Sequence, residues 1–195
     1  MNSQSEPAGP PETARILYFH GWGSRFDPGK GKILSLGRIG LVHGLTVDYT
    51  LHPHAVFATY AELLTRYPRA LVVGTSLGGF YAAWLGAEFN RRFLAINPAT
   101  APGKSLQAHV GTGVNHAGEP FDLSQACVSA YDALCFRLDG PGTVVLDRGD
   151  EVLDARATLE LVRGGLPVVV FDGGSHRFDH MDDLIESRPG LFQPC

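Results

Sequence analysis

Residues 70–86 read ALVVGTSLGGFYAAWLG, an apolar run that passes through the pattern G-x-S-x-G into an apolar helical stretch. The pattern requires a strand that turns abruptly into a helix and holds Ser76 in a strained backbone conformation, which only small flanking residues allow. Gly74 and Gly78 meet that requirement. In a chain with 24 glycines the pattern alone is a weak signal, but the strand-like run before it and the helix after it support it. The segment therefore predicts an exposed serine on a sharp strand-to-helix turn.

Similar apolar runs recur along the chain and alternate with helical patterns. The predicted strands cover residues 15–19, 45–49, 70–74, 93–97, 143–147 and 167–172, and the predicted helices cover 57–67, 79–89, 152–162 and 181–187. The strand runs are nearly continuous rather than alternating, as in strands that are covered on both faces. Strands that alternate with helices imply right-handed crossovers. We predict an α/β fold with about six mostly parallel strands and helices on both faces.

Two stretches interrupt this alternation. Residues 21–44 predict a glycine-rich loop with a short helix, and residues 101–140 form an insertion that contains GTGVNHAGEP and then a helical pattern over 124–135. Loops of this length are usually functional or mobile, so we expect the insertion to lie over or near the site, without a large lid domain. A mobile polar tail at 1–13 is expected before a single domain at 14–195.

The composition excludes several classes of partner. The formal net charge is -4, and no basic block is present, which argues against nucleic acid and anionic membrane surfaces. No apolar run approaches the roughly 20 residues of a membrane-spanning helix. Three scattered cysteines give neither a disulfide framework nor a metal-site spacing, so we expect a cytoplasmic protein with no metal and no cofactor.

An activated serine needs a base within hydrogen-bond reach. His176 is the best candidate, because it follows the last predicted strand in VVVFDGGSHRF and because two glycines let the chain fold back over the sheet edge. It also follows the serine and the candidate acids, which gives the chain order Ser, Asp, His that is known for serine nucleophiles on this kind of turn. Four other histidines lack a preceding strand end: His43, His109, His116 and His180. His52 and His54 lack further metal ligands nearby and fit a surface loop better.

The base in turn needs an acid that fixes its tautomer. The segment VVLDRGDEVLD offers Asp147, Asp150 and Asp154. Asp150 is favoured, because it lies in the loop just past the strand. Asp147 is expected at the strand end and Asp154 one turn into the next helix, where either could be an ordinary cap or surface carboxylate.

Backbone N–H groups complete the predicted site. The first N–H after the serine, that of Leu77, lies at a helix N-terminus, whose dipole favours a developing negative charge. A second donor is expected from His-Gly-Trp-Gly at residues 20–23, directly after the first strand, and we assign it to the N–H of Trp22. His20 is better explained as a structural histidine that fixes this loop through its ring nitrogens.

Five segments, LYFHGWGS, GTSLGGFYAAWLG, INPA, GDEVLD and GGSHRF, resemble in order and spacing the small bacterial esterases of the YqiA type, a branch of the α/β-hydrolases. The resemblance covers nearly all of residues 16–178 and implies a triad of Ser76, Asp150 and His176. It also implies a single-domain hydrolase that acts on short acyl esters and on acyl-CoA thioesters. The chain departs from the pattern at Trp22-Gly23, where Phe-Asn is more usual, and in the insertion, so the acyl-chain preference is left open.

The sequence therefore predicts a serine esterase that uses a two-step acyl transfer on a small acyl ester. An acyl-CoA thioesterase with the same triad is the nearer alternative, for which Arg25, Lys30 and Lys32 are modest candidates to hold the anionic tail. A catalytically silent α/β-hydrolase that acts as a binding module is the other alternative. Every expected catalytic position is filled, which argues against it.

Overall fold

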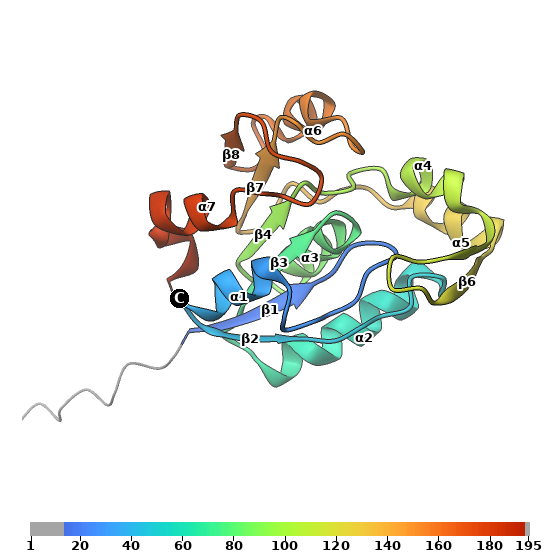
Figure 1. Cartoon of the computed structure of the whole chain (residues 1–195), viewed down its shortest axis with the longest axis horizontal. Helices are drawn as coiled ribbons and strands as arrows, with labels where there is room; N and C mark the ends of the chain where they lie inside the picture. The colour runs from blue at the N-terminus through green and yellow to red at the C-terminus, as the bar shows by residue number, and fades with distance from the viewer. Residues whose placement is uncertain (1–13, 194–195) are drawn as a thin grey trace, which may run out of the picture.

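The computed structural model describes residues 14–193 and contains a six-stranded parallel sheet in the order β2-β1-β3-β4-β7-β8 (Figure 1). Its strands are β1 (Arg15–Phe19), β2 (Leu41–Gly44), β3 (Leu71–Thr75), β4 (Phe93–Ile96), β7 (Gly142–Asp147) and β8 (Val168–Phe171). The tail predicted at 1–13 lies outside the described residues. Strands β2 and β3 flank β1 on opposite sides, so the strand order reverses at β1, the kind of position at which open α/β sheets bind their ligands. The predicted α/β sheet is confirmed.

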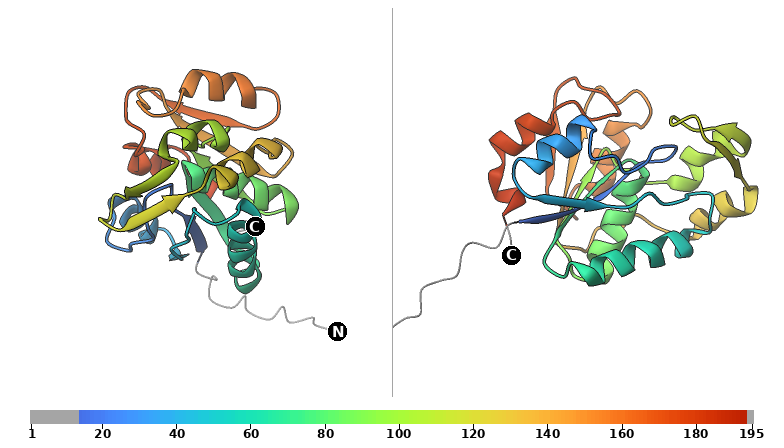
Figure 2. Two further views of the ribbon diagram at one scale, coloured as in Figure 1. Left: turned by 90° about the vertical axis from the view of Figure 1, so that its right-hand side faces the viewer. Right: turned by 60° about the horizontal axis from the view of Figure 1, so that its bottom comes forward.

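Successive side chains of each strand enter two separate cores, as the strand period of two requires. Leu17 and Phe19 face one core, whereas Ile16 and Tyr18 face the other. The first face is covered by α2 (Pro53–Arg66), α3 (Leu77–Glu88) and α6 (Ala155–Val162), and the second by α1 (Gly31–Gly37) and α7 (Met181–Ser187) (Figure 2). The sheet is therefore covered on both faces, as its continuous apolar runs predicted.

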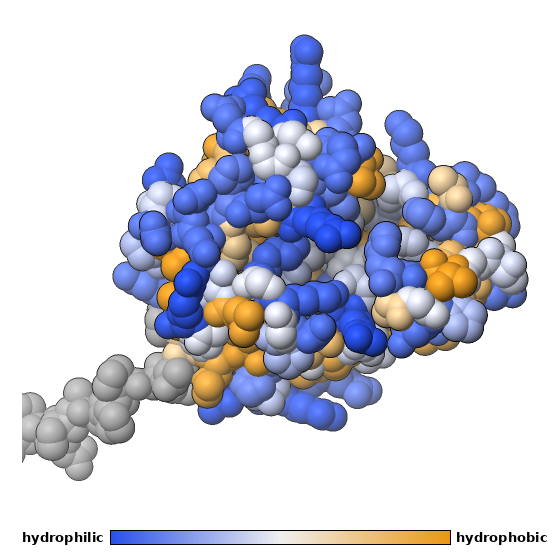
Figure 3. Space-filling model, viewed as in Figure 1, coloured by the Kyte–Doolittle hydropathy of each residue, from blue (hydrophilic) through white to orange (hydrophobic). Residues whose placement is uncertain are grey.

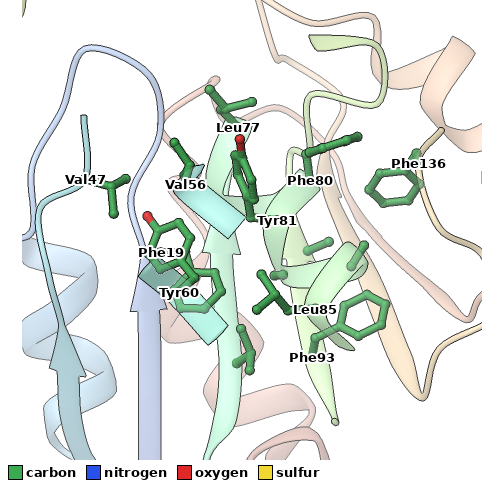
Figure 4. Close-up of a cluster of buried hydrophobic side chains, with 14 of the residues drawn as sticks. Phe19, Val47, Val56, Tyr60, Leu77, Phe80, Tyr81, Leu85, Phe93 and Phe136 are labelled. Carbon is green, nitrogen blue, oxygen red and sulfur yellow. The ribbon is translucent and has the colours of Figure 1, made fainter. Parts of the chain in front are cut away.

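Helix α3 is apolar around most of its circumference because it lies inside the molecule. Nine of its twelve residues are buried. Figure 4 shows Tyr81 and Leu85 of this helix in one cluster with Phe19 of β1, Tyr60 of α2 and Phe93 of β4. Full burial of a large apolar side chain contributes about 1.5–3 kcal/mol, so the helix is firmly held. Its N-terminus, which follows the serine turn, thereby has a rigid support.

The insertion at 101–140 is more ordered than predicted. It contains α4 (Pro102–Leu106), η1 (Gln107–His109), an antiparallel hairpin of β5 (Gly111–Val114) and β6 (Pro120–Leu123), α5 (Gln125–Ala130) and η2 (Tyr131–Ala133). The sequence does not predict this hairpin, because both strands have only four residues and β5 is half glycine. Its turn is instead organised by one side chain, since Asn115 Oδ1 accepts hydrogen bonds from the N–H groups of Ala117 and Glu119, both at 2.9 Å. The helix expected over 124–135 is shorter, ending at Ala130.

The strand predicted at 45–49 is wrong, because β2 ends before it. The N–H of Val47 donates to the ring of His20 at 3.0 Å, and the Tyr49 hydroxyl donates to the His20 carbonyl at 2.5 Å. These groups bind the loop after β1 rather than a strand, although Val47 and Tyr49 are both buried. The apolar character of this segment therefore reflects burial outside the sheet ladder.

Two helix starts also differ from the prediction. Helix α2 begins at Pro53, a residue that suits the first helical position, and the His52 ring accepts a hydrogen bond from the N–H of His54. Helix α6 begins only at Ala155, with Asp154 as its cap, because the preceding N–H groups are held by the carboxylate of Asp150. Asp154 is thus a cap rather than a residue inside the helix.

The surface is largely hydrophilic on the face shown in Figure 3, with hydrophobic residues in small separate patches. One such patch lies on the side of the β5–β6 hairpin, which carries the exposed Val114. Within the described residues, no helix has both the length and the apolar character that crossing a bilayer requires. The chain ends its described part with α7 and the short η3 (Pro189–Phe192).

Candidate active site

Ser76 lies on the predicted sharp turn between β3 and α3, with φ 55° and ψ -122°. This backbone conformation is costly for a residue with a side chain, and it persists because the surroundings hold it. A Cβ atom at Gly74 would lie 2.1 Å from the Gly78 carbonyl oxygen, and one at Gly78 would lie 2.2 Å from the Phe19 carbonyl oxygen. Both glycines of the pattern are therefore required by close backbone approach, as the sequence predicted.

The turn places Ser76 in a hydrogen-bonded row with the two other predicted residues. Ser76 Oγ lies 3.0 Å from His176 Nε2, and His176 Nδ1 lies 2.9 Å from the nearer carboxylate oxygen of Asp150. With the proton on Nδ1, the ring donates to Asp150 and accepts from the serine hydroxyl. The His176 side chain is 20% exposed and that of Asp150 is 2% exposed. The structure thus brings all three residues together and leaves His176 partly exposed to solvent.

Asp150 is held in a fixed orientation. Its Oδ1 accepts hydrogen bonds from the N–H groups of Val152 and Leu153, at 2.9 and 2.8 Å. Burial disfavours charge on this carboxyl, but the hydrogen bond from His176 and those from the two N–H groups outweigh it and hold its pKa below the ordinary value. Asp150 is therefore an ionised partner for the histidine.

The loop after β1 lies against the serine. A Cβ atom at Gly21 would be 3.1 Å from Ser76 Cβ, a tight contact, so a side chain there would press the loop against the serine. Within the described residues, neither the N–H of Trp22 nor that of Leu77 has a protein acceptor. Both N–H groups are thus left open to an external acceptor.

His20 holds this loop in place, as expected. Its Nδ1 binds the Gly21 carbonyl at 2.9 Å, and its Nε2 accepts from the N–H of Val47 at 3.0 Å. The second bond requires an unprotonated Nε2. Burial, with a smaller effect of the nearby Lys30 charge, lowers the pKa of His20 to about 4. The neutral ring is therefore the native form at neutral pH.

This buried ring predicts a pH-dependent loss of stability. Because the folded-state pKa of about 4 lies below the unfolded value of 6.5, the unfolded chain binds the proton more readily as the pH falls. We expect the unfolding free energy to fall by about 2 kcal/mol, because of His20 alone, when the pH is lowered from 7 to 5. Urea unfolding of the wild type and of His20→Asn at both pH values measures this difference. An equal loss in both proteins would contradict the assignment.

The β5–β6 hairpin is docked on the same loop. The Trp22 ring packs edge-on against Phe121 of β6, with ring centroids 5.2 Å apart, and lies 5.7 Å from the His109 ring. The N–H of His116 donates to the Gly23 carbonyl at 3.0 Å. Part of the insertion therefore contacts Trp22, the residue that supplies the candidate N–H donor.

The sequence does not predict the place of two buried polar residues near the site. Asp147, expected as a possible surface or cap carboxylate, is fully buried, and its Oδ1 accepts from Nδ1 of His180 at 2.7 Å. Asn97, part of the INPA segment, is buried with φ 40° and donates from Nδ2 to the Ser175 carbonyl at 3.0 Å. A polar residue at the end of an apolar strand was the available signal for both.

A six-stranded parallel sheet with helices on both faces, a strained serine turn after β3 and a histidine after the last strand together define the α/β-hydrolase fold. Solved structures agree. Est1E from Butyrivibrio proteoclasticus superposes with a TM-score of 0.70 at 15% identity, covering 91% of this chain and 86% of Est1E. Alpha/beta hydrolase domain-containing protein 10 from mouse gives a TM-score of 0.65 at 14% identity, covering 90% and 91% of the two chains.

Comparison of the sequence identifies a more specific group than the fold does. Residues 15–188 match the family described as Uncharacterised protein family (UPF0227), and the chain belongs to this family. A "UPF0227 protein" of Shewanella loihica is 26% identical over 169 residues, which cover 84% of this chain and 90% of the relative. This membership confirms the resemblance to the YqiA type on which the residue assignments partly rest.

Proposed function

We propose that this protein is a serine esterase that hydrolyses short acyl esters, with Ser76 as nucleophile, His176 as general base and Asp150 as the orienting acid. The observation that carries the proposal is the continuous row from Ser76 Oγ through His176 to Asp150, with steps of 3.0 and 2.9 Å. These distances lie within the range that proton transfer from a hydroxyl to an imidazole requires. The strained serine turn and the two open N–H groups support the same chemistry.

The reaction follows from this geometry in two steps. His176 Nε2 takes the proton of Ser76 as Oγ attacks the ester carbonyl carbon, and the N–H groups of Leu77 and Trp22 donate to the oxyanion. The tetrahedral intermediate collapses, the ester C–O bond breaks, and His176 returns the proton to the leaving alcohol. Water, deprotonated by His176, then attacks the acyl-enzyme and releases the acid, which regenerates the serine hydroxyl. No cofactor or metal takes part in either step.

An acyl-CoA thioester is the alternative substrate, and the lysines suggested for it have other contacts. Lys30 Nζ donates to Ser24 Oγ at 2.7 Å, and Lys32 Nζ donates to the Arg177 carbonyl. These bonds favour a role in holding two loops rather than in binding an anionic tail. An acyl ester is therefore the favoured substrate, and an acyl-CoA thioester is the alternative.

The test uses the wild-type protein. We expect a fluorophosphonate probe to label it on a single peptide that contains Ser76, and nitrophenyl acetate and butyrate to be hydrolysed. A graded series of acyl esters then fixes the chain-length preference, and butyryl ester against butyryl-CoA decides between ester and thioester. A protein that is neither labelled nor active on any ester or thioester would be a silent binding module, and the proposal would be wrong.

A further inference from the structure

The buried carboxylate of Asp147 is aimed at the loop that carries His176. Its Oδ2 accepts hydrogen bonds from the N–H groups of Ser175 and Asp179, at 3.2 and 3.0 Å. Its Oδ1 accepts from the ring of His180 at 2.7 Å. All three donors belong to residues 175–180, and none of them belongs to the row that forms the candidate catalytic site. One side chain thus holds both ends of the short segment around the base.

This arrangement explains a glycine in the loop. A Cβ atom at Gly174, where φ is +72°, would lie 2.0 Å from Asp147 Oδ2. The carboxylate can therefore reach the loop only because residue 174 has no side chain. His180 is itself fixed, because its ring stacks on Phe171 of β8 with centroids 4.9 Å apart and 7° between the planes.

Asn97 extends the same network toward the serine. Its Oδ1 accepts from the N–H of Asp147 at 2.8 Å, and its Nδ2 donates to the Ser175 carbonyl at 3.0 Å. The neighbouring Ile96 carbonyl accepts from the N–H of Ser76 at 3.0 Å. The end of β4 therefore contacts the nucleophile turn on one side and the base loop on the other.

Other side chains hold the remaining polar groups of the segment. Glu151 accepts from the N–H of His176 at 2.9 Å, and Lys32 donates to the Arg177 carbonyl. Residues 172–180 contain neither helix nor strand, so these contacts take the place of a ladder. Such external support matters because a shift of about 1 Å in a reacting group can cost 10²-fold in rate.

We propose that Asp147, together with His180, is a positioning pair for the base: it sets the place of His176 by binding the backbone on both sides of it, and it touches none of the reacting atoms. The inference rests on the proposed function, since it gives the pair a role in catalysis rather than only in stability. A purely structural pair would lower the unfolding free energy without changing the turnover of the folded protein.

The test compares three variants. Asp147→Asn keeps the shape but presents an amide to N–H donors, and we expect kcat on nitrophenyl butyrate to fall about 10²-fold with KM within twofold. His180→Leu removes the ring donor, for which we expect about a 10-fold fall. His180→Asn keeps an N–H near the position of Nδ1, and we expect it to restore kcat to within about threefold of the wild type. The matched control is Asp172→Asn, a 95% exposed carboxylate in the same loop, with unchanged kcat expected.

A second measurement, proton NMR of the hydrogen bond between His176 and Asp150, does not require the protein to be active. The Nδ1 proton shared by His176 and Asp150 gives a low-field proton resonance, identified by its loss in Asp150→Asn. We expect this signal to broaden in Asp147→Asn and His180→Leu and to persist in His180→Asn and Asp172→Asn. If Asp147→Asn does not fold, the two His180 variants carry the comparison.

The outcomes separate the two proposals. Unchanged kcat and an unchanged resonance in folded Asp147→Asn, or equal losses in His180→Leu and His180→Asn, would overturn the positioning role. Inactive, unlabelled wild-type protein would refute the proposed function alone, because the resonance would still show whether Asp147 and His180 set the place of His176.

Discussion

Replacing Ser76 by alanine is expected to lower kcat on nitrophenyl butyrate by 10⁴- to 10⁶-fold. On the proposed mechanism the variant loses the only hydroxyl in the row, so no acyl-enzyme can form, while the N–H groups of Leu77 and Trp22 would still be present to bind the carbonyl. The side chain makes no other hydrogen bond in the described residues than the one to His176 Nε2. The fold should therefore be kept. Steady-state kinetics, fluorophosphonate labelling and circular dichroism together measure the effect.

The control for this variant is Ser187→Ala, which removes a hydroxyl that binds the Asp183 carbonyl inside α7. We expect its kcat to match that of the wild type. Activity of folded Ser76→Ala within tenfold of the wild type would remove this serine from the mechanism. It would point to another nucleophile or to hydrolysis by a contaminant, which probe labelling of the same preparation distinguishes.

The substitution Asp150→Asn is expected to lower kcat on nitrophenyl butyrate by a factor on the order of 10⁴. The carboxamide matches the carboxylate in size but offers an NH₂ group to His176 Nδ1. The ring would then carry its proton on Nε2 and could no longer accept from Ser76, 3.0 Å away. Substrate binding does not use this carboxyl, so KM should change little.

Asp154→Asn provides the comparison, because asparagine caps helices as well as aspartate does. The Asp154 side chain accepts from the N–H of Ala157 at 2.9 Å and has no contact with His176. We expect its kcat to stay within twofold of the wild type. Equal losses in the two variants would show that the loop after β7 responds as a whole and that Asp150 has no special part in the chemistry.

The site could be predicted largely from local chemistry. The serine turn needs Gly74 and Gly78 at fixed spacing, and a base that follows the last strand must reach the same sheet edge. Asp150 was favoured over its neighbours because only a loop residue past the strand can turn toward that edge. Each of these predictions depends only on the end of one strand and the few residues after it, and such a short stretch can be recognised in the sequence.

The rest depends on contacts between distant segments. The segment 45–49 is apolar like a strand, but its polar groups are bound by His20 and so leave the ladder. The hairpin at 111–123 has little apolar alternation, since Asn115 organises its turn. Asp147 and His180 are separated by 33 residues, and no local pattern marks them as partners. The hydrophobic periodicity of a sequence predicts which residues are buried. It does not predict which buried polar groups form hydrogen bonds with each other.

Ser76 and His176 stand 100 residues apart in the chain and meet only through the sheet. A polypeptide still emerging from the ribosome carries a complete nucleophile turn long before the imidazole is synthesised, and so cannot attack esters around it. On the proposed mechanism, a single proteolytic nick between residues 173 and 180 would likewise abolish activity while leaving all six strands of the sheet uncut. If the proposed mechanism holds, turnover would detect such a cut in the chain more sensitively than any spectrum of the sheet.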